Sequence, residues 1–445
     1  MPWLHNAVYL VLLVLLAPWL LAQAIRRGKY RQGLAAKLLG RVPIRRGQRP
    51  CIWLHAVSVG EVNLLTELVK QIETVLPQVE CAVSTTTRTG YQLARRRWPD
   101  RFVFYCPLDF SWATRRAMRR IRPEVLVLAE LELWPNLIRA AGVHGAKVAV
   151  VNGRLSDRSF RGYCRLRTLV RGMFRRLELI AAQSEQYADR FVQLGAPAAS
   201  VHVTGSLKFD GVTGDRDDLR VRQLASLAGF DSEDRVLLAG STQEGEEALA
   251  LEAFGRLAGP FPQLRLVLVP RHPERFAEVG ELLDASGVPW QLRSQLDEHS
   301  QMRYALANRA APRVLLVDTV GELAAWWGTA HFAYVGGSQG RREGQNMIEP
   351  AAYGAAVCFG PRTRNFRDVV QLLLAEQAAE VVHDASELAV FVRRLLDNPT
   401  GAAAMGERAR QLVAGQRGAT QRTVDLLAKL IEPSCPSCRQ PRRAA

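Results

Sequence analysis

Three short motifs in the first half of the chain place carboxylates or hydroxyls directly after an apolar run of strand length. The first, residues 53–61 (WLHAVSVGE), ends in Ser58 and Glu61, which have the S-x-x-E spacing of a helix capping box. The helix dipole also keeps a carboxylate in a first helical turn ionised, so Glu61 is a candidate general base. The spacing alone leaves both the structural and the catalytic role open.

The other two motifs carry an anion-binding pattern and a carboxylate pair. Residues 84–90 (STTTRTG) bring hydroxyls, Arg88 and a glycine to the end of a strand, where backbone N–H groups could hold an anion. In residues 130–136 (ELELWPN), Glu130 and Glu132 follow a buried run, and an extended backbone would put both on one face. A cap or edge role remains the alternative for this pair.

The second half of the chain repeats one arrangement, in which a loop of small or basic residues follows an apolar strand and precedes a helix. The three loops are Gly240-Ser241-Thr242, Pro270-Arg271-His272-Pro273 and Gly336-Gly337-Ser338. Together they predict a cradle for a ligand that carries phosphate. Asn346 and Glu349 follow as i,i+3 neighbours on one predicted helix face, where Glu349 could accept the hydroxyls of a ribose. A surface-charge role stays open for Arg271, and a helix-start role for Glu349.

Apolar runs of strand length alternate with amphipathic stretches of helical length through most of the chain, which is typical of parallel α/β sheets. A polar, acidic stretch interrupts the alternation. We therefore expect two Rossmann-like domains at residues 31–209 and 223–432, a solvated linker at 210–222 and a disordered tail at 433–445. Ligands of such folds bind at the carboxyl ends of the strands, so we expect the site in a cleft between the two sheets.

The N-terminal segment predicts a membrane anchor. Residues 7–25 carry no charge, and as a helix they would extend about 28 Å, which is close to one hydrocarbon thickness. Lys and Arg follow this segment and none precedes it, so residues 1–30 predict a single-pass anchor with a basic flank at the inner membrane, and a cytoplasmic body. Ala22-Gln23-Ala24 leaves a cleaved signal peptide as the alternative.

The formal net charge of +16 comes mostly from arginine clusters in the N-terminal half. Beside a membrane anchor, such clusters favour anionic lipid headgroups or a phosphorylated lipid substrate. They lack interleaved aromatic residues, and the chain has no helix-turn-helix or zinc-finger pattern, so we expect no nucleic-acid partner. Cys435 and Cys438 form a lone CxxC without a second pair, and we expect no metal site.

The order of the motifs resembles one family, the transferases of 3-deoxy-D-manno-octulosonic acid (Kdo). The resemblance runs from about Trp53 to Phe366 and is specific because the motifs are many and stand in order. They are WLHAVSVGE, STTTRTG, ELELWPNLI, VNGRLSDRS, LIAAQSEQYADRFVQLGA, VTGSLKFD, GSTQEGEE, LVPRHPERF, DTVGELAAWW, YVGGS, and QNMIEPA with FGPRTRNF.

The resemblance implies a glycosyltransferase fold of the B type, with a lipid A precursor of the lipid IVA kind bound by the N-terminal domain and the donor CMP-Kdo by the C-terminal one. It implies an inverting transfer with Glu61 as the general base and no cofactor. Candidates for holding Kdo or supporting the site are Arg88, Glu130 and Lys208. The implied CMP ligands are Ser241, Arg271, His272, Gly337, Asn346 and Glu349. Lys and Arg suffice for two anionic groups without a metal.

The chain departs from the family pattern at three positions near the donor loops. Gln243 and Gln345 stand where the family usually has His, and Glu343 stands where it usually has Gly. Gln forms hydrogen bonds but carries no proton near neutral pH. Two alternatives therefore stay open, namely a membrane-anchored glycosyltransferase of the same fold that uses another nucleotide sugar, and a non-catalytic protein that binds anionic lipid.

Overall fold

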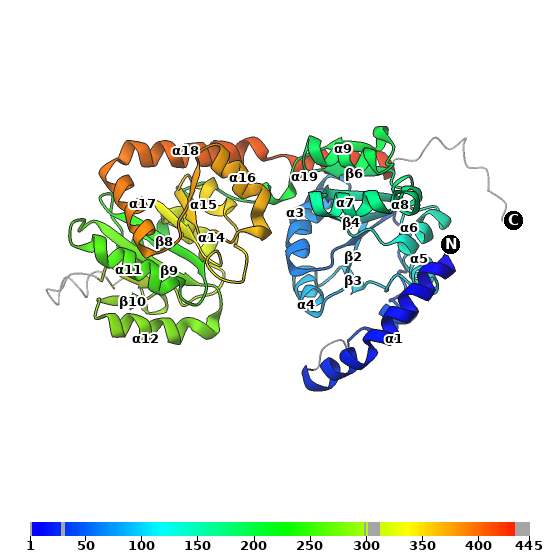
Figure 1. Ribbon diagram of the computed structural model, residues 1–445, viewed down its shortest axis with the longest axis horizontal. Helices are drawn as coiled ribbons and strands as arrows, with labels where there is room; N and C mark the ends of the chain where they lie inside the picture. The colour runs from blue at the N-terminus through cyan, green and yellow to red at the C-terminus, as the bar shows by residue number, and fades with distance from the viewer. Residues whose placement is uncertain (1, 28–31, 298–299, 301–311, 432–445) are drawn as a thin grey trace. The chain divides into compact units, whose positions relative to one another are not determined.

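The computed structural model describes residues 2–27, 32–297, 300 and 312–431. The chain forms two compact units (Figure 1). The first comprises the chain up to Asp210 together with the chain from Arg417 onward, and the second comprises Gly211–Gln416. Over the described residues, each unit is built on one seven-stranded sheet whose strand pairs are all parallel. The predicted α/β class with two Rossmann-like units is confirmed.

The first sheet has the strand order β3-β2-β1-β4-β5-β6-β7. Its strands are β1 (Cys51–His55), β2 (Glu80–Thr85), β3 (Phe102–Tyr105), β4 (Val125–Ala129), β5 (Lys147–Gly153), β6 (Leu179–Ala182) and β7 (Val201–Val203). The central strands are buried along their whole length because helices cover both faces. One face packs on α3 (Val59–Val75), α4 (Arg88–Arg97) and α19 (Ala419–Ile431). The other packs on α5 (Ser111–Ile121), α6 (Pro135–Val143), α8 (Arg167–Phe174) and α9 (Glu185–Gln193).

The remaining helical elements of the first unit are α1 (Pro2–Arg27), α2 (Leu34–Leu39), α7 (Asp157–Arg165), and the 3₁₀ turns η1 (Ala198–Ser200) and η2 (Leu207–Phe209). Each strand of this sheet ends in a loop that leads toward the next helix. Since the strands are parallel, the loops after β1, β2, β4 and β5 meet at one edge of the sheet. The three motifs of the first half of the chain lie in these loops.

The second sheet has the order β10-β11-β9-β8-β12-β13-β14. Its strands are β8 (Arg235–Thr242), β9 (Leu264–Pro270), β10 (Trp290–Leu292), β11 (Val314–Leu316), β12 (Phe332–Val335), β13 (Ala356–Phe359) and β14 (Ala379–Val381). Its helices are α10 (Leu219–Ala228), α11 (Glu246–Ala258), α12 (Phe276–Ser286), α14 (Leu323–Trp326), α15 (Ile348–Ala352), α16 (Arg367–Ala375), α17 (Ala385–Asp397) and α18 (Pro399–Gln416). The 3₁₀ turns are η3 (Pro273–Arg275), η4 (Arg293–Gln295), η5 (Trp327–Thr329) and η6 (Arg364–Phe366).

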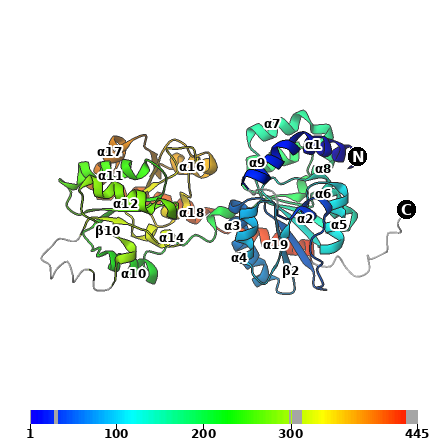
Figure 2. The same ribbon diagram turned by 90° about the horizontal axis from the view of Figure 1, so that it is seen from below.

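The last helix, α19, differs from the domain bounds expected from sequence, which placed residues 223–432 together. Val424 and Leu427 lie in the core of the first unit, and Figure 2 shows α19 against that unit beside α3. The Asp210 carboxylate fixes the start of the helix by accepting the backbone N–H groups of Gly418 and Thr420 at 2.7 and 2.5 Å. An amphipathic pattern shows that a helix buries one face, but not which sheet it covers.

The acidic stretch at 210–222 also differs from the solvated linker expected there. The Arg216 guanidinium donates to the backbone carbonyls of Tyr353, Gly328 and Ala330 at 2.6–2.9 Å, which ties the stretch to the second unit. Three buried carbonyls converge on Arg216, and this convergence is invisible in a local sequence window. The tail predicted to be disordered, 433–445, lies outside the described residues.

The N-terminal helix α1 forms as predicted and contains Pro18. Among the residues whose side chains the structure describes, no helix is both long and apolar enough to cross a membrane, so the predicted spanning anchor is not supported. The beginning of α1 is held by polar contacts. The Asn6 side chain pairs with Ser111, and the Tyr9 hydroxyl donates to Asp109 at 3.0 Å. Beyond this point α1 exposes large apolar side chains, including Val11, Val14 and Leu15.

Candidate functional site

Glu61 lies in the first turn of α3, at the edge where the strands of the first sheet end. One carboxylate oxygen accepts the backbone N–H of Val57 at 2.8 Å, and the other accepts the Ser58 hydroxyl at 2.9 Å. Ser58 is the N-cap of α3 and accepts the Glu61 N–H at 3.4 Å, so the predicted capping box is present. Burial raises the pKa of Glu61, these hydrogen bonds oppose the shift, and the charge of Glu130 adds to it.

The loop before α4 supports the Glu61 loop. Thr87 caps α4 by accepting the Gly90 N–H at 3.1 Å, and its hydroxyl donates to the Val57 carbonyl at 3.0 Å. A Cβ at Gly90 would approach the Thr87 hydroxyl to 2.8 Å, so a side chain there would displace this cap. Arg88, the first residue of α4, is exposed at the same edge as Glu61. The motif at 84–90 therefore positions the loop at 56–58 and presents a cation beside it.

Two more carboxylates stand beside Glu61 in the loop between β4 and α6. Glu130 has a φ of 53°, a left-handed conformation that costs a glutamate about 1–2 kcal/mol, so the segment is not the extended one expected. Burial, together with the charges of Glu61 and Glu130, raises the pKa of Glu132 to about 7. The Trp134 indole N–H donates to Glu132 at 3.1 Å. Strain and a shifted carboxyl pKa at one sheet edge are features of functional sites.

Lys208 is half-buried in the 3₁₀ turn η2, and Asn152 at the end of β5 fixes this turn. The Asn152 side-chain oxygen accepts the Leu207 N–H at 3.0 Å, and Asn152 itself has a φ of 54°. Asn152 was not singled out from sequence. Its only sequence signal is its place within VNGRLSDRS, because the residue it holds lies 55 positions further along the chain.

His55, the last residue of β1, is buried and neutral. Its Nδ1 pairs with the Ser84 hydroxyl at 2.9 Å, and that hydroxyl also accepts the Trp53 indole N–H at 2.7 Å. Burial lowers the pKa of His55 to about 4. Among the described residues its Nε2 has no hydrogen-bond partner. The histidine of the first motif therefore ties β1 to β2 just before the Glu61 loop.

In the second unit, the loops after β8 and β9 meet at the corresponding sheet edge. Ser241 is buried with a φ of 56°, and the backbone N–H of Arg271 donates to the Thr242 carbonyl at 3.1 Å. The Arg271 side chain is exposed, and His272 is half-buried with its Nδ1 3.9 Å from the Glu274 carboxylate. These loops thus bring Arg271 next to the end of β8, as the strand order requires.

Glu246, the first residue of α11, occupies the centre of this edge and was missed from sequence. One of its carboxylate oxygens accepts the N–H groups of Gly337 and Gln243 at 2.6 and 2.8 Å. The other accepts those of Ser338 and Gln339, both at 2.9 Å, and the hydroxyl of Tyr334 at 3.3 Å. The N–H of Gly337, expected to face the donor, is therefore taken by a carboxylate.

Gly336 and Gly337 allow the two loops to approach this closely. A Cβ on Gly336 would lie 2.6 Å from the Cα of Thr242, and Gly337 has a φ of 68° with the Gln345 side chain 3.0 Å from its Cβ position. The Thr242 hydroxyl and the Gln243 side-chain nitrogen are buried and have no hydrogen-bond partner among the described residues. Buried donors of this kind are costly unless a ligand satisfies them.

Asn346 and Glu349 meet, although not as neighbours on one helix, because α15 begins at Ile348. The Asn346 amide donates to the Glu349 carboxylate at 2.9 Å, and its oxygen accepts the Ile348 N–H at 3.1 Å. Burial raises the pKa of Glu349, whereas Asn346, Trp327 and the charge of Arg271 lower it. Because the charge of Arg271 acts on the pKa of Glu349, Arg271 and Glu349 lie near one another.

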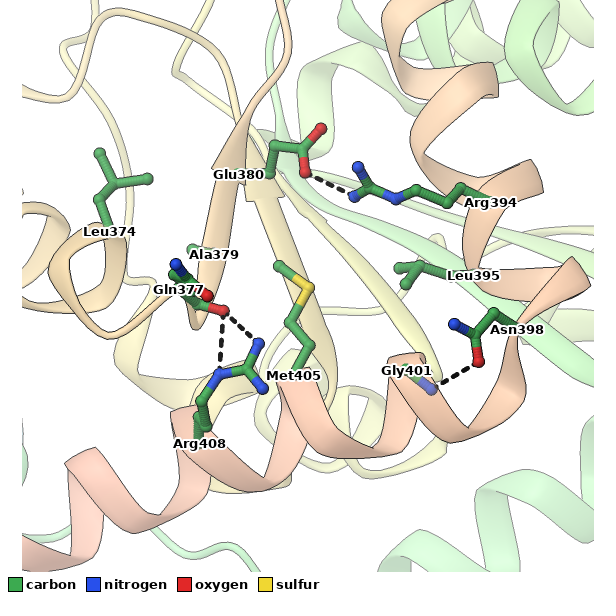
Figure 3. A pocket seen from close by; sticks show the side chains of 10 residues that line it. All are labelled: Leu374, Gln377, Ala379, Glu380, Arg394, Leu395, Asn398, Gly401, Met405 and Arg408. Carbon is green, nitrogen blue, oxygen red and sulfur yellow. Dashed lines mark hydrogen bonds and ion pairs between the residues drawn. The ribbon is translucent and has the colours of Figure 1, made fainter.

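The second unit also has two hollows that do not include the predicted site residues. The one drawn in Figure 3, about 400 Å³, is lined by α16, α17, α18 and β14. Its charged side chains are already paired, Arg394 with Glu380 and Arg408 with the Gln377 carbonyl. The other, about 750 Å³, is lined by Arg235 and Phe332 where β8 and β12 begin. None of the predicted site residues lines either one. In the described part of the chain, no group of three or more His, Cys, Asp or Glu is arranged to hold a metal.

Two parallel α/β units whose ligand-facing loops stand at the strand ends define the B type of glycosyltransferase fold. A UDP-GlcNAc 2-epimerase from Neisseria meningitidis has a similar fold, with a TM-score of 0.58 and 14% identity over 85% of this chain and all of that one. Residues 27–211 match the family described as 3-deoxy-D-manno-octulosonic-acid transferase (kdotransferase).

Curated relatives extend the match over nearly the whole chain. A 3-deoxy-D-manno-octulosonic acid transferase of Haemophilus influenzae is 33% identical over 92% of this chain and 94% of its own length. One of Bordetella pertussis is 36% identical over 95% and 98%, respectively. The chain therefore belongs to the Kdo transferase family, and it is a glycosyltransferase.

Proposed function

We propose that this glycosyltransferase moves Kdo from CMP-Kdo to a lipid A precursor of the lipid IVA type, with inversion and with Glu61 as the general base. The single observation that carries the proposal is the match to curated Kdo transferases along more than nine-tenths of the chain. The site adds a carboxylate at the strand-end edge of the first unit, where the resemblance puts the acceptor.

In the proposed step, Glu61 takes the proton of an acceptor hydroxyl while the hydroxyl oxygen bonds to the anomeric carbon of Kdo. The bond from this carbon to the CMP phosphate breaks, and CMP leaves with the electron pair. The Glu61 carboxylate accepts hydrogen bonds from Val57 and Ser58 and is only partly buried, so it can also receive a donor hydroxyl. Its raised pKa makes it a stronger base than an exposed glutamate. Arg88, Glu130 and Lys208 are proposed to hold Kdo or to support this site.

The donor is proposed to bind at the strand ends of the second unit. Arg271 and His272 would pair with the phosphate, and Asn346 with Glu349 would bind the cytidine ribose. Ser241 and the Gly337 loop would shape the site, because the Gly337 N–H already donates to Glu246. In the part of the chain that the structure describes, the buried Thr242 hydroxyl and Gln243 side-chain nitrogen have no hydrogen-bond partner, which supports a polar ligand here, since such a ligand would satisfy buried donors. No cofactor or metal enters this chemistry.

Attachment to the cytoplasmic face of the inner membrane is proposed from the surface of the first unit. α7 and α8 expose arginines, and Leu166 and Leu169 project between them with exposed fractions of 53% and 75%. α1 exposes a further apolar surface. Basic residues attract anionic headgroups at about 1 kcal/mol each, and apolar side chains enter the acyl boundary. A membrane-embedded lipid acceptor would be reached from such a surface.

The test is a transfer assay with CMP-Kdo and a tetraacylated lipid A precursor in the presence of EDTA, with products resolved by mass. Wild-type protein should add Kdo, and Glu61→Gln should add almost none while it still binds CMP-Kdo. If folded, lipid-bound wild type transfers no Kdo, the proposed donor is wrong.

A second candidate keeps the fold and reaction but changes the nucleotide sugar. It is favoured by Gln243, Gln345 and Glu343, which stand in or beside the donor loops in place of the family's usual residues. Tighter binding of a uridine or adenosine diphosphate sugar than of CMP-Kdo, measured by calorimetry, would select it.

A further inference from the structure

The helix that follows the Glu130–Trp134 loop lacks a cap of its own. Its N-cap residue is Trp134, whose side chain forms no capping hydrogen bond. The cap comes instead from Asp109, which lies before α5 and is only 4% exposed. The Asp109 carboxylate accepts the N–H groups of Asn136 and Leu137 at 3.0 and 2.8 Å, and its backbone carbonyl accepts the Asn136 side-chain amide at 2.6 Å.

Asp109 and its neighbours also hold the beginning of α1. The Tyr9 hydroxyl donates to the Asp109 carboxylate at 3.0 Å, and the Tyr9 ring meets Phe110 edge-on at 6.1 Å. α5 also lacks a side-chain cap of its own, and Asn6 supplies one by accepting the Ser111 N–H at 2.9 Å. α1 therefore contributes two polar side chains to a buried junction that begins both α5 and α6.

We propose that Asn6 and Tyr9 of α1 act as positioning residues for the loop that carries Glu130 and Glu132, through Asp109 and Asn136. The effect of these two residues on the reaction rests on the proposed function. α1 would then affect the rate of transfer separately from any attachment to lipid. Asp109 would link α1 to the loop that carries Glu130 and Glu132.

The physical argument concerns a short, strained loop fixed at its two ends. At its start, Glu130 holds a left-handed backbone and its N–H donates to the Val151 carbonyl at 2.9 Å. At its end, the Asp109 carboxylate fixes the first turn of α6. A charged cap at a buried helix start contributes about 1–2 kcal/mol, which is comparable to the strain stored at Glu130. Loss of the contacts that fix the first turn of α6 would let the strained backbone at Glu130 relax, and the Glu132 carboxylate would then move away from Glu61.

The experiment compares Tyr9→Phe and Asn6→Ala with wild type and with Tyr353→Phe. Tyr353 is the matched control for the loss of a buried tyrosine hydroxyl, because it lies in the second unit, where its hydroxyl pairs with Thr213 at 3.2 Å. Amide hydrogen exchange is measured by mass spectrometry over residues 130–143. Values of kcat and KM for CMP-Kdo are measured in parallel, with co-sedimentation on anionic vesicles.

The expected result is faster exchange at 130–143 and a roughly three- to ten-fold lower kcat in Tyr9→Phe and Asn6→Ala, at unchanged donor KM and vesicle binding. Tyr353→Phe should match wild type in amide exchange at 130–143. Unchanged exchange at 130–143 would overturn the proposal, and so would faster exchange with an unchanged kcat. If wild type transfers no Kdo, the proposed function fails, whereas the exchange data still decide whether α1 orders this loop.

Discussion

Glu61 and Glu246 stand at corresponding places in the two units of this glycosyltransferase, and their surroundings are opposite. Each lies at the start of the helix that follows the first strand of its sheet, β1 or β8. Glu246 is 1% exposed and receives five hydrogen bonds from four backbone N–H groups and one hydroxyl. Glu61 is only partly buried, receives its hydrogen bonds from Ser58 and Val57, three and four positions before it, and stands beside Glu130 and Glu132.

The difference shows that residue type and helix position do not decide what a carboxylate does. Donors from a distant loop saturate Glu246, so its ionised form holds the Gly336–Gln339 loop in place and has no capacity left for a substrate proton. Burial, together with the charge of Glu130, raises the pKa of Glu61, so its carboxylate is more basic and can still accept a proton. One sheet edge thus has a structural carboxylate, and the other has the candidate base.

The largest effect expected from this comparison is on turnover. Glu61→Gln should lower the transfer rate by roughly two to four orders of magnitude, because an amide cannot take the acceptor proton. The Gln oxygen can still accept a capping hydrogen bond, so the melting temperature should change little. Initial rates and circular dichroism check both points. A variant that keeps more than a tenth of the wild-type rate would remove Glu61 from the role of base.

The corresponding change at Glu246 should act on stability and donor binding. Glu246→Gln replaces one acceptor oxygen by an NH₂ group that faces buried N–H donors, so the free energy of unfolding should fall by about 2–3 kcal/mol. Calorimetry should also show weaker CMP-Kdo binding. Urea denaturation measures the stability. An unchanged unfolding midpoint would mean that the Gly336–Gln339 loop does not depend on this carboxylate.

A smaller effect is expected at the cation of the donor edge. Arg271→Ala should weaken CMP-Kdo binding roughly 10- to 100-fold, the loss of one charge-assisted contact to a phosphate. Arg393→Ala is the matched control, because Arg393 forms an exposed ion pair with Asp397 at 3.7 Å on α17. Titration calorimetry compares the two. Equal affinities in both variants would exclude Arg271 from the donor site.

The smallest effect concerns the pH dependence of stability. The folded-state pKa of Glu132, about 7, lies above its unfolded value, so the folded state binds the proton more tightly and stability falls as pH rises from about 4.5 to 7. Glu132→Gln removes this loss. The free energy of unfolding of the variant, relative to that of wild type, should therefore be about 1–2 kcal/mol higher at pH 8 than at pH 5. Urea denaturation at both pH values tests it. If the difference in unfolding free energy between wild type and variant is the same at pH 5 and pH 8, the shifted pKa of Glu132 is contradicted.

Local patterns predicted the fold well because a buried parallel strand and an amphipathic helix are written in consecutive residues. The apolar runs that precede Ser58, Glu130 and Gly336 form β1, β4 and β12, and the Ser58–Glu61 capping box is present. The ordered motifs also identified the family, which the curated relatives confirm.

The features missed from sequence depend on contacts between distant residues. Glu246 meets donors about 90 positions away, Asp109 caps a helix 27 positions ahead, and α19 joins a unit whose sheet ended some 200 residues earlier. The left-handed backbone of Glu130 was missed because glycine, the usual sign of that conformation, is absent there.

The most direct test of the central claim is the single-turnover rate of Kdo transfer between pH 4 and pH 8, with both substrates saturating, for wild type and Glu61→Gln. The wild-type rate should fall as pH drops through the raised pKa of Glu61, because the protonated carboxyl cannot accept the acceptor proton. The variant should be slow and show no such titration. A variant that retains both the wild-type rate and its pH dependence would show that another group is the base.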